Sequence, residues 1–288
     1  MICITGAGGT LGKEILKQLR TESIKFRAAF FSKEKVAEAR TEGIDAVAVD
    51  YNNLETLRTA FLECDKIFLL APNLPNQTQL ELNAVEMAKV AGVKHIVKLS
   101  VLGAYEELFD IAKIHRRVEC AIESSGMRWT FLRSNRFMQN IVTYMRHPIT
   151  AESTLYSTSG EAKVSHVDVR DVAAVAVKTL VDPVHEGKAY NLTGSEALTY
   201  SQIAVELSKV LGRQIDHISV PPSLWRKSLL DEGLPEETID RMLDLERCIR
   251  ESEIGSSVTD SIKQVTGFDP RRFSAFAKES VQSLQTSS

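Results

Sequence analysis

The chain begins with Met1-Ile2-Cys3-Ile4-Thr5-Gly6-Ala7-Gly8-Gly9-Thr10-Leu11-Gly12. Its first five residues form a short apolar run, which predicts a strand. A helical pattern follows, in which one stripe carries the apolar side chains Leu11, Ile15, Leu16 and Leu19. Between the two lies a glycine series with G-x-x-G-x-x-G spacing. A strand, a glycine-rich turn and an amphipathic helix in immediate succession predict the first unit of an open α/β sheet.

Each glycine of this turn has a mechanical reason to be there. Gly6 allows a tight turn, Gly8 or Gly9 lets the backbone approach a pyrophosphate, and Gly12 permits close packing of helix on strand. The N–H groups at the start of the helix would then face the phosphates. We therefore predict a dinucleotide site, with a purely structural turn as the alternative. Its predicted contacts here are Gly6, Gly8, Gly9, Thr10, Leu11 and Gly12.

Strand and helix patterns alternate as far as residue 133, which is typical of a parallel sheet covered by helices on both faces. We expect further strands at 26–31, 46–49, 67–71, 95–100 and 129–133, and helices at 33–42, 54–61, 77–91 and 112–125. After Asn140 the alternation lapses. There we expect strands at 154–157, 163–166 and 189–192, helices at 169–180, 200–211, 222–231 and within 236–253, and a frayed tail at 282–288.

The predicted fold is thus α/β, a Rossmann-type doubly wound parallel sheet with a smaller C-terminal α/β portion that binds substrate. We assign residues 1–140 to the NAD(P)-binding domain. Residues 141–288 form the smaller portion, interleaved with the core, and close the substrate cleft at the carboxyl ends of the strands.

The composition is that of an ordinary globular protein, with 43% hydrophobic and 25% charged residues among 288. A net charge of −3 argues against a nucleic-acid surface driven by bulk charge. No apolar stretch approaches the roughly 20 residues of a membrane span, and no leader pattern precedes the first strand, so we expect a cytoplasmic protein. The four cysteines form no CxxC pair, which argues against a zinc site or disulfide framework and predicts no metal.

The end of the second expected strand bears on the choice of nicotinamide cofactor. An acid there would bind the ribose 2′-hydroxyl, whereas cations and hydroxyls suit a 2′-phosphate. The sequence has no acid at the strand tip, while Ser32 and Lys33 follow it. This favours NADP(H), with NAD(H) left open because the segment also reads as a solvated first helical turn. Asp50 is expected to accept from adenine or a backbone N–H, or else to cap the next helix.

Six further segments carry a family resemblance. They are Asp50-Tyr51, Gly92-Val93-Lys94-His95-Ile96, Trp129-Thr130-Phe131-Leu132-Arg133, Phe137-Met138-Gln139-Asn140, Val167-Asp168-Val169-Arg170-Asp171-Val172-Ala173 and Ala189-Tyr190-Asn191-Leu192-Thr193-Gly194. In this order they resemble the NmrA-like branch of the atypical short-chain dehydrogenases/reductases, and within it the quinone and dye reductases. The resemblance runs from Met1 to about Phe276. It implies a Rossmann core, a substrate cleft and NAD(P)H-dependent reduction, although some members are regulators that bind dinucleotide as redox sensors.

Two positions depart from the family pattern. Many members have an arginine that contacts the 2′-phosphate where this chain has Phe31, and the family's Leu-Arg-Pro-Asn pattern appears with Ser134 in place of proline. The resemblance therefore leaves the preference between NADP and NAD open.

The classical Tyr-x-x-x-Lys pair, in which tyrosine donates a proton to a carbonyl oxygen, is missing: no tyrosine has a lysine four residues on. We expect the substitutes after the fifth strand, with Ser100, Tyr105 and His115 as catalytic candidates and Ser100 and Lys113 also contacting cofactor. In the resemblance, His115 falls where many relatives carry lysine. The alternatives are a surface histidine in a basic run, and a serine that caps the backbone.

Other contacts are expected in loops at the carboxyl ends of strands, where such folds bind ligands. The predicted cofactor contacts there are Ala71, Pro72 and Asn73. The predicted substrate contacts are Tyr105, Asn135, Phe137, Met138 and Trp225, with Phe137 and Met138 equally readable as core. The function hypothesis is hydride transfer from NAD(P)H to a quinone-like or dye-like aromatic acceptor. The alternative is a non-catalytic redox-sensing regulator with a protein partner, and a homodimer is left open.

Overall fold

The computed structural model describes residues 1–285. Its strands are β1 Ile2–Ile4, β2 Phe26–Phe30, β3 Asp45–Ala48, β4 Lys66–Leu69, β5 His95–Val101, β6 Arg128–Ser134, β7 Thr154–Ser157, β8 Lys188–Leu192 and β9 Asp216–Ser219. Its α-helices are α1 Thr10–Thr21, α2 Lys33–Thr41, α3 Leu54–Phe61, α4 Gln77–Val90, α5 Asp110–Ser124, α6 Gln139–Tyr144, α7 Val169–Val181, α8 Tyr200–Leu211, α9 Pro222–Asp231, α10 Glu236–Glu251, α11 Ser261–Thr266 and α12 Phe273–Gln285.

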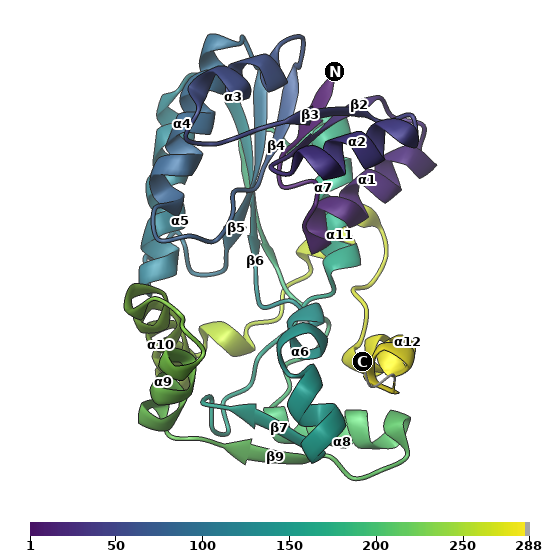
Figure 1. The fold of residues 1–288 in the computed structure, drawn as a ribbon, viewed down its shortest axis with the longest axis vertical. Coiled ribbons are helices and arrows are strands. Elements are labelled where there is room, and N and C mark those ends of the chain that lie inside the picture. Colours follow the sequence, from purple (N-terminus) through teal and green to yellow (C-terminus); the bar gives the residue numbers. More distant parts are fainter. Residues whose placement is uncertain (286–288) are drawn as a thin grey trace. The chain divides into compact units, whose positions relative to one another are not determined.

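The main sheet has seven strands in the order β3-β2-β1-β4-β5-β6-β8. The pairs that join β3, β2, β1, β4 and β5 are all parallel. Helices α3, α4 and α5 lie on one face of this part of the sheet, and α1, α2 and α7 on the other (Figure 1). This is the doubly wound Rossmann arrangement that the sequence predicts. The strand order reverses between β1 and β4, which is where open α/β sheets bind their ligands, outside the carboxyl ends of the strands.

The chain divides into two compact units. The first comprises residues 1–105, 112–133 and 169–190, and the second residues 106–111, 134–168 and 191–288. Each unit draws on both halves of the predicted division at residue 140, because α7 packs against α1 in the first unit while the short segment 106–111 groups with the second. A closing of the C-terminal portion over a substrate cleft stays a prediction.

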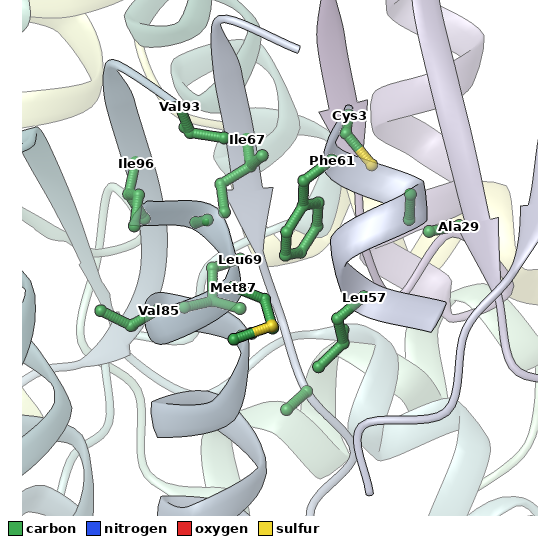
Figure 2. Packing of buried hydrophobic residues seen from close by; sticks show 14 of the residues in the cluster. Cys3, Ala29, Leu57, Phe61, Ile67, Leu69, Val85, Met87, Val93 and Ile96 are labelled. Atoms are coloured by element: carbon green, nitrogen blue, oxygen red, sulfur yellow. The ribbon is translucent and has the colours of Figure 1, made fainter. Parts of the chain in front are cut away.

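One part of the core of the first unit lies between the sheet and helices α3 and α4. Phe61 of α3 and Met87 of α4 pack with Ile67 and Leu69 of β4, and all four are buried (Figure 2). Burial of apolar surface contributes roughly 25 cal/mol per Å². This packing fixes β4 beside β1 and so holds the edge of the sheet at which the glycine turn emerges.

The second half differs from the sequence expectations in several places, and helices α6 and α11 are also additional to the expected elements. Residues 163–166 are not a strand: Val164 makes only an isolated antiparallel bridge to Leu198. Strand β9 was not expected and pairs with β7, and α12 was not expected and packs against α8. The tail predicted to fray at 282–288 is helical as far as Gln285, because Leu284 is buried, while 286–288 lie outside the described residues.

None of the helices within residues 1–285 is both long enough and apolar enough to span a bilayer. The four cysteines, all inside that range, are free thiols.

Candidate nucleotide and hydride-acceptor site

The glycine turn joins β1 to α1 through contacts that no side chain could share. A Cβ on Gly12 would lie 2.1 Å from the carbonyl oxygen of Gly6 and 2.8 Å from Cα of Ala7. Gly6 itself has φ of +63°, and its Cβ would meet the carbonyl oxygen of Leu70 at 2.9 Å. Both glycines are therefore fixed by the backbone that surrounds them.

The start of α1 is open to a ligand. Gly9 occupies the N-cap with no side-chain cap, so the first N–H groups of the helix, on Thr10, Leu11 and Gly12, have no acceptor inside it. A Cβ on Gly9 would meet only the Gly6 carbonyl oxygen, at 3.4 Å. Free donors, the positive end of the helix dipole and a turn without side chains together fit a pyrophosphate.

A basic hollow adjoins this turn. Its volume is about 500 Å³, it lies between α1 and α2, and Gly8, Lys13, Lys17, Arg20 and Lys35 are among its lining residues. Arg20 pairs with Glu42 at 3.0 Å, whereas Lys13 and Lys35 make no ion pair within residues 1–285. A Cβ on Gly8 would lie 3.3 Å from Nζ of Lys35, so this ammonium group lies against the glycine turn itself. Lys35 is thus a candidate that the sequence reasoning missed.

The residues predicted to choose the cofactor have local structural partners. Ser32 caps α2: its hydroxyl accepts from the Lys35 N–H and donates to Glu34 at 2.6 Å. Lys33 is exposed at the first position of α2. Asp50 accepts from the Asn52 N–H through Oδ1, while Asn53 rather than Asp50 caps α3. Their contacts to a dinucleotide stay predictions, as do those of Ala71, which is buried, and of the exposed Pro72 and Asn73.

Beyond β5, a buried carboxylate contacts the predicted residue Ser100 and two arginines. Glu119 of α5 is fully buried and accepts from the Ser100 hydroxyl at 2.7 Å and from Nε and Nη2 of Arg133 at 3.0 and 2.7 Å. Arg116 reaches it at 3.2 Å. The guanidinium carbons of Arg116 and Arg133 both lie 5.4 Å from the centre of the Tyr105 ring, within cation–π range. Tyr105, 64% exposed, is therefore a flat ring held by two cations beside the strand end.

His115 is buried on the sheet-facing side of α5, so its interpretation as a solvated surface histidine is wrong. Of the basic residues 115–117, only Arg117 is exposed. His115 shares the inner face of α5 with Val118, Glu119 and Ile122. Nδ1 of His115 lies 3.1 Å from Nζ of Lys98. Burial, and secondarily the Lys98 charge, hold the pKa of His115 well below its usual value, so the ring is neutral. Lys113, two residues earlier, is exposed.

The other predicted substrate contacts lie in the second unit. Asn135 donates to Ser165 Oγ and the Gly255 carbonyl oxygen at 2.8 and 2.9 Å and accepts from the Arg136 N–H, so its amide is fully engaged locally. Met138 belongs to the hydrophobic core of that unit, which was one of the two interpretations of this residue, the other being a substrate contact. Phe137 and Trp225 are half-buried. Their contact with substrate stays a prediction.

Comparison with known proteins agrees with this fold and turn. The model of the NmrA-like family matches residues 1–277. The chain belongs to the NmrA-like family. The NAD(P)H azoreductase of Xenophilus azovorans is 33% identical, over 96% of this chain and 97% of that protein. Quinone oxidoreductase 2 of Escherichia coli is 28% identical, over 89% and 88%. The structure of Citrobacter triphenylmethane reductase superposes with a TM-score of 0.87 at 26% identity, covering 98% of this chain and 99% of that one.

The six segments that suggested the family lie in both units, and the match extends through both. The resemblance seen in the sequence is therefore confirmed.

Proposed function

We propose that this protein is an NADP(H)-dependent reductase that transfers hydride to a flat, conjugated acceptor such as a quinone or a dye. The observation that carries the proposal is the glycine turn with its uncapped helix N-terminus, because Gly6 and Gly12 admit no side chain and the first N–H groups of α1 have no acceptor inside the helix. The azoreductase, quinone oxidoreductase and dye reductase among its relatives support the acceptor class.

Different residues are proposed to contact the phosphate groups and the nicotinamide end of the cofactor. The N–H groups that open α1 would bind the pyrophosphate, and Lys35 and Lys13, which line the hollow beside the turn, would offer their ammonium groups to a 2′-phosphate. We retain Ser32, Lys33, Asp50, Pro72 and Asn73 as further proposed contacts, and Lys113 and Ser100 at the nicotinamide end.

When bound, the cofactor would supply a hydride from nicotinamide C4. A quinone would take up that hydride together with a proton from solvent, whereas a cationic dye would take up the hydride alone. Because a quinone or cationic dye delocalises the charge that arrives, no strong protein acid is required, which agrees with the absence of the tyrosine-lysine pair. The exposed Tyr105 ring offers a stacking surface to such an acceptor. We also propose a cytoplasmic location, which the four free thiols favour.

The test is turnover by the full-length protein with a panel of quinones, azo dyes and triphenylmethane dyes, with NADPH and NADH compared at equal concentration. We expect loss of reduced cofactor in proportion to acceptor consumed. Tight cofactor binding with no turnover on any member of the panel would overturn the proposal and favour a redox-sensing regulator.

Replacing Lys35 by alanine is expected to weaken NADPH binding by about 10- to 100-fold, because a charge-assisted contact to the 2′-phosphate contributes roughly 1.5–3 kcal/mol. NADH, which lacks that phosphate, should bind unchanged. Calorimetric titration of both cofactors checks this. Lys25→Ala is the matched control, since Lys25 is an exposed lysine immediately before β2, at the opposite end of that strand from Lys35. Equal losses in the two variants would show that only general surface charge is involved.

A further inference from the structure

A cluster of three buried side chains joins β5, α4 and α5. Lys98 of β5 and Glu81 of α4 are fully buried, and His115 of α5 is 7% exposed. Nζ of Lys98 lies 2.7 Å from Oε2 of Glu81, 3.0 Å from the carbonyl oxygen of Leu99 and 3.1 Å from Nδ1 of His115. All three elements belong to the first unit.

The geometry fixes which ring nitrogen of His115 carries the proton. A lysine ammonium group has three N–H donors and no acceptor, and here three acceptors surround it. Nδ1 of His115 must therefore accept, which requires it to be unprotonated. In a neutral ring the proton then lies on Nε2, and Nε2 is a permanent donor.

Nε2 is not used inside the protein. His115 has no hydrogen bond within residues 1–285 other than the one to Lys98. Nε2 also remains accessible to solvent. Within residues 1–285, the fully buried polar atoms without a partner include Oε1 of Glu81 but not Nε2 of His115. The N–H that the cluster orients is thus available to a ligand.

A purely structural role does not account for this arrangement. Burying a lysine and a glutamate costs desolvation that their attraction only partly offsets, and apolar side chains would fill the same space at no such cost. The third ammonium N–H is directed to an imidazole, although Oε1 of Glu81 lies buried without a partner. What the cluster gains is a histidine with one defined tautomer.

We propose that Lys98, held by Glu81, fixes His115 as a neutral Nε2–H donor, and that this N–H binds the electron-rich oxygen or nitrogen of the hydride acceptor. The inference rests on the reductase function proposed above and names the group that replaces the missing tyrosine. The hydride and its two electrons go to the acceptor, and charge that develops on the acceptor heteroatom is stabilised by the hydrogen bond. The His115 proton is not transferred, and the proton in the product comes from solvent. Lys98 and Glu81 are positioning residues.

Nitrogen NMR of the full-length, ¹⁵N-labelled protein tests the tautomer without any assay of activity. We expect His115 to show a protonated Nε2 and an unprotonated Nδ1, with no titration from about pH 5 to about pH 8. Within residues 1–285, the charge that acts on the ring is that of Lys98, which in turn contacts Glu81. In the double variant Lys98→Met/Glu81→Leu, which removes both buried charges together, the Nδ1 signal should move toward the protonated position. A proton on Nδ1 in the natural protein would overturn the inference.

Kinetics test the role of the donor. His115→Leu is expected to lower kcat by about 10²-fold, the usual cost of losing one such donor, while the affinity for NADPH stays unchanged. His115→Gln retains a neutral N–H and should recover part of the loss. His95→Gln, at the first residue of β5, is the matched control for a buried histidine and should retain kcat.

The outcomes separate the inference from the proposed function. If the natural protein reduces no acceptor, the reductase proposal fails, whatever the NMR shows. If the natural protein turns over and His115→Leu retains its kcat, the reductase proposal stands and the role of His115 is refuted.

Discussion

Gly12→Ala is expected to abolish measurable cofactor binding and to lower the free energy of unfolding by about 3 kcal/mol or more. The new Cβ would stand 2.1 Å from the carbonyl oxygen of Gly6 and 2.8 Å from Cα of Ala7, and both are backbone atoms that cannot rotate away. The first turn of α1 must then move off β1, and its N–H groups move with it. Urea unfolding and calorimetric titration with NADPH measure the two effects.

Gly9→Ala separates these effects. Its Cβ would lie 3.4 Å from the nearest atom outside the neighbouring residues, and φ at Gly9 is −80°, so the fold accommodates a methyl group there. We expect stability within about 1 kcal/mol of the natural protein but weaker NADPH binding, because the methyl group stands where the pyrophosphate approaches. If Gly12→Ala had the same stability to urea and the same affinity for NADPH as the natural protein, the assigned turn geometry would be wrong.

Lys98→Met is expected to destabilise the protein by about 3–5 kcal/mol, because it leaves the Glu81 carboxylate buried without its cation. Met fills the space of the lysine stem, so the loss reports charge rather than volume. Lys98→Met/Glu81→Leu should recover most of the stability, since no buried charge then remains. Urea unfolding of the single and double variants measures the difference.

The exposed pair Glu55–Arg58 provides the control. Its atoms approach to 2.6 Å, about as closely as those of Glu81–Lys98, but its side chains are 65% and 40% exposed. Arg58→Met should therefore cost less than about 1 kcal/mol. A similar small cost for Lys98→Met would mean that Glu81 is not charged in the folded protein.

The helices and strands of the first unit could be predicted from the sequence because each of them has a local pattern of apolar residues or glycines. The stripe Leu11, Ile15, Leu16 and Leu19 predicted α1, and all four are buried. The second unit was harder to predict because its later elements depend on partners far away in the chain. Strand β9 is defined by its pairing with β7, some sixty residues earlier, and the end of α12 is ordered by burial of Leu284.

The candidate site shows the same division. The glycine turn is local in sequence and could be read directly, whereas Lys35 was passed over for Lys33 because spacing does not show which helical side chain turns back over Gly8. Lys98 and Glu81 were missed because a charged residue in the middle of a strand is more often exposed, and seventeen residues separate the pair. The burial of His115 had a signal: with Val118, Glu119 and Ile122 it follows helical spacing on one face of α5.

The most direct test of the central claim is single-turnover oxidation of bound NADPH by a quinone, with the transferred hydrogen at nicotinamide C4 replaced by deuterium. We predict that NADPH and quinone disappear one for one, faster than without protein, and that deuterium slows the step. If NADPH binds tightly but is oxidised no faster than in buffer, the protein does not transfer hydride and the reductase assignment is contradicted.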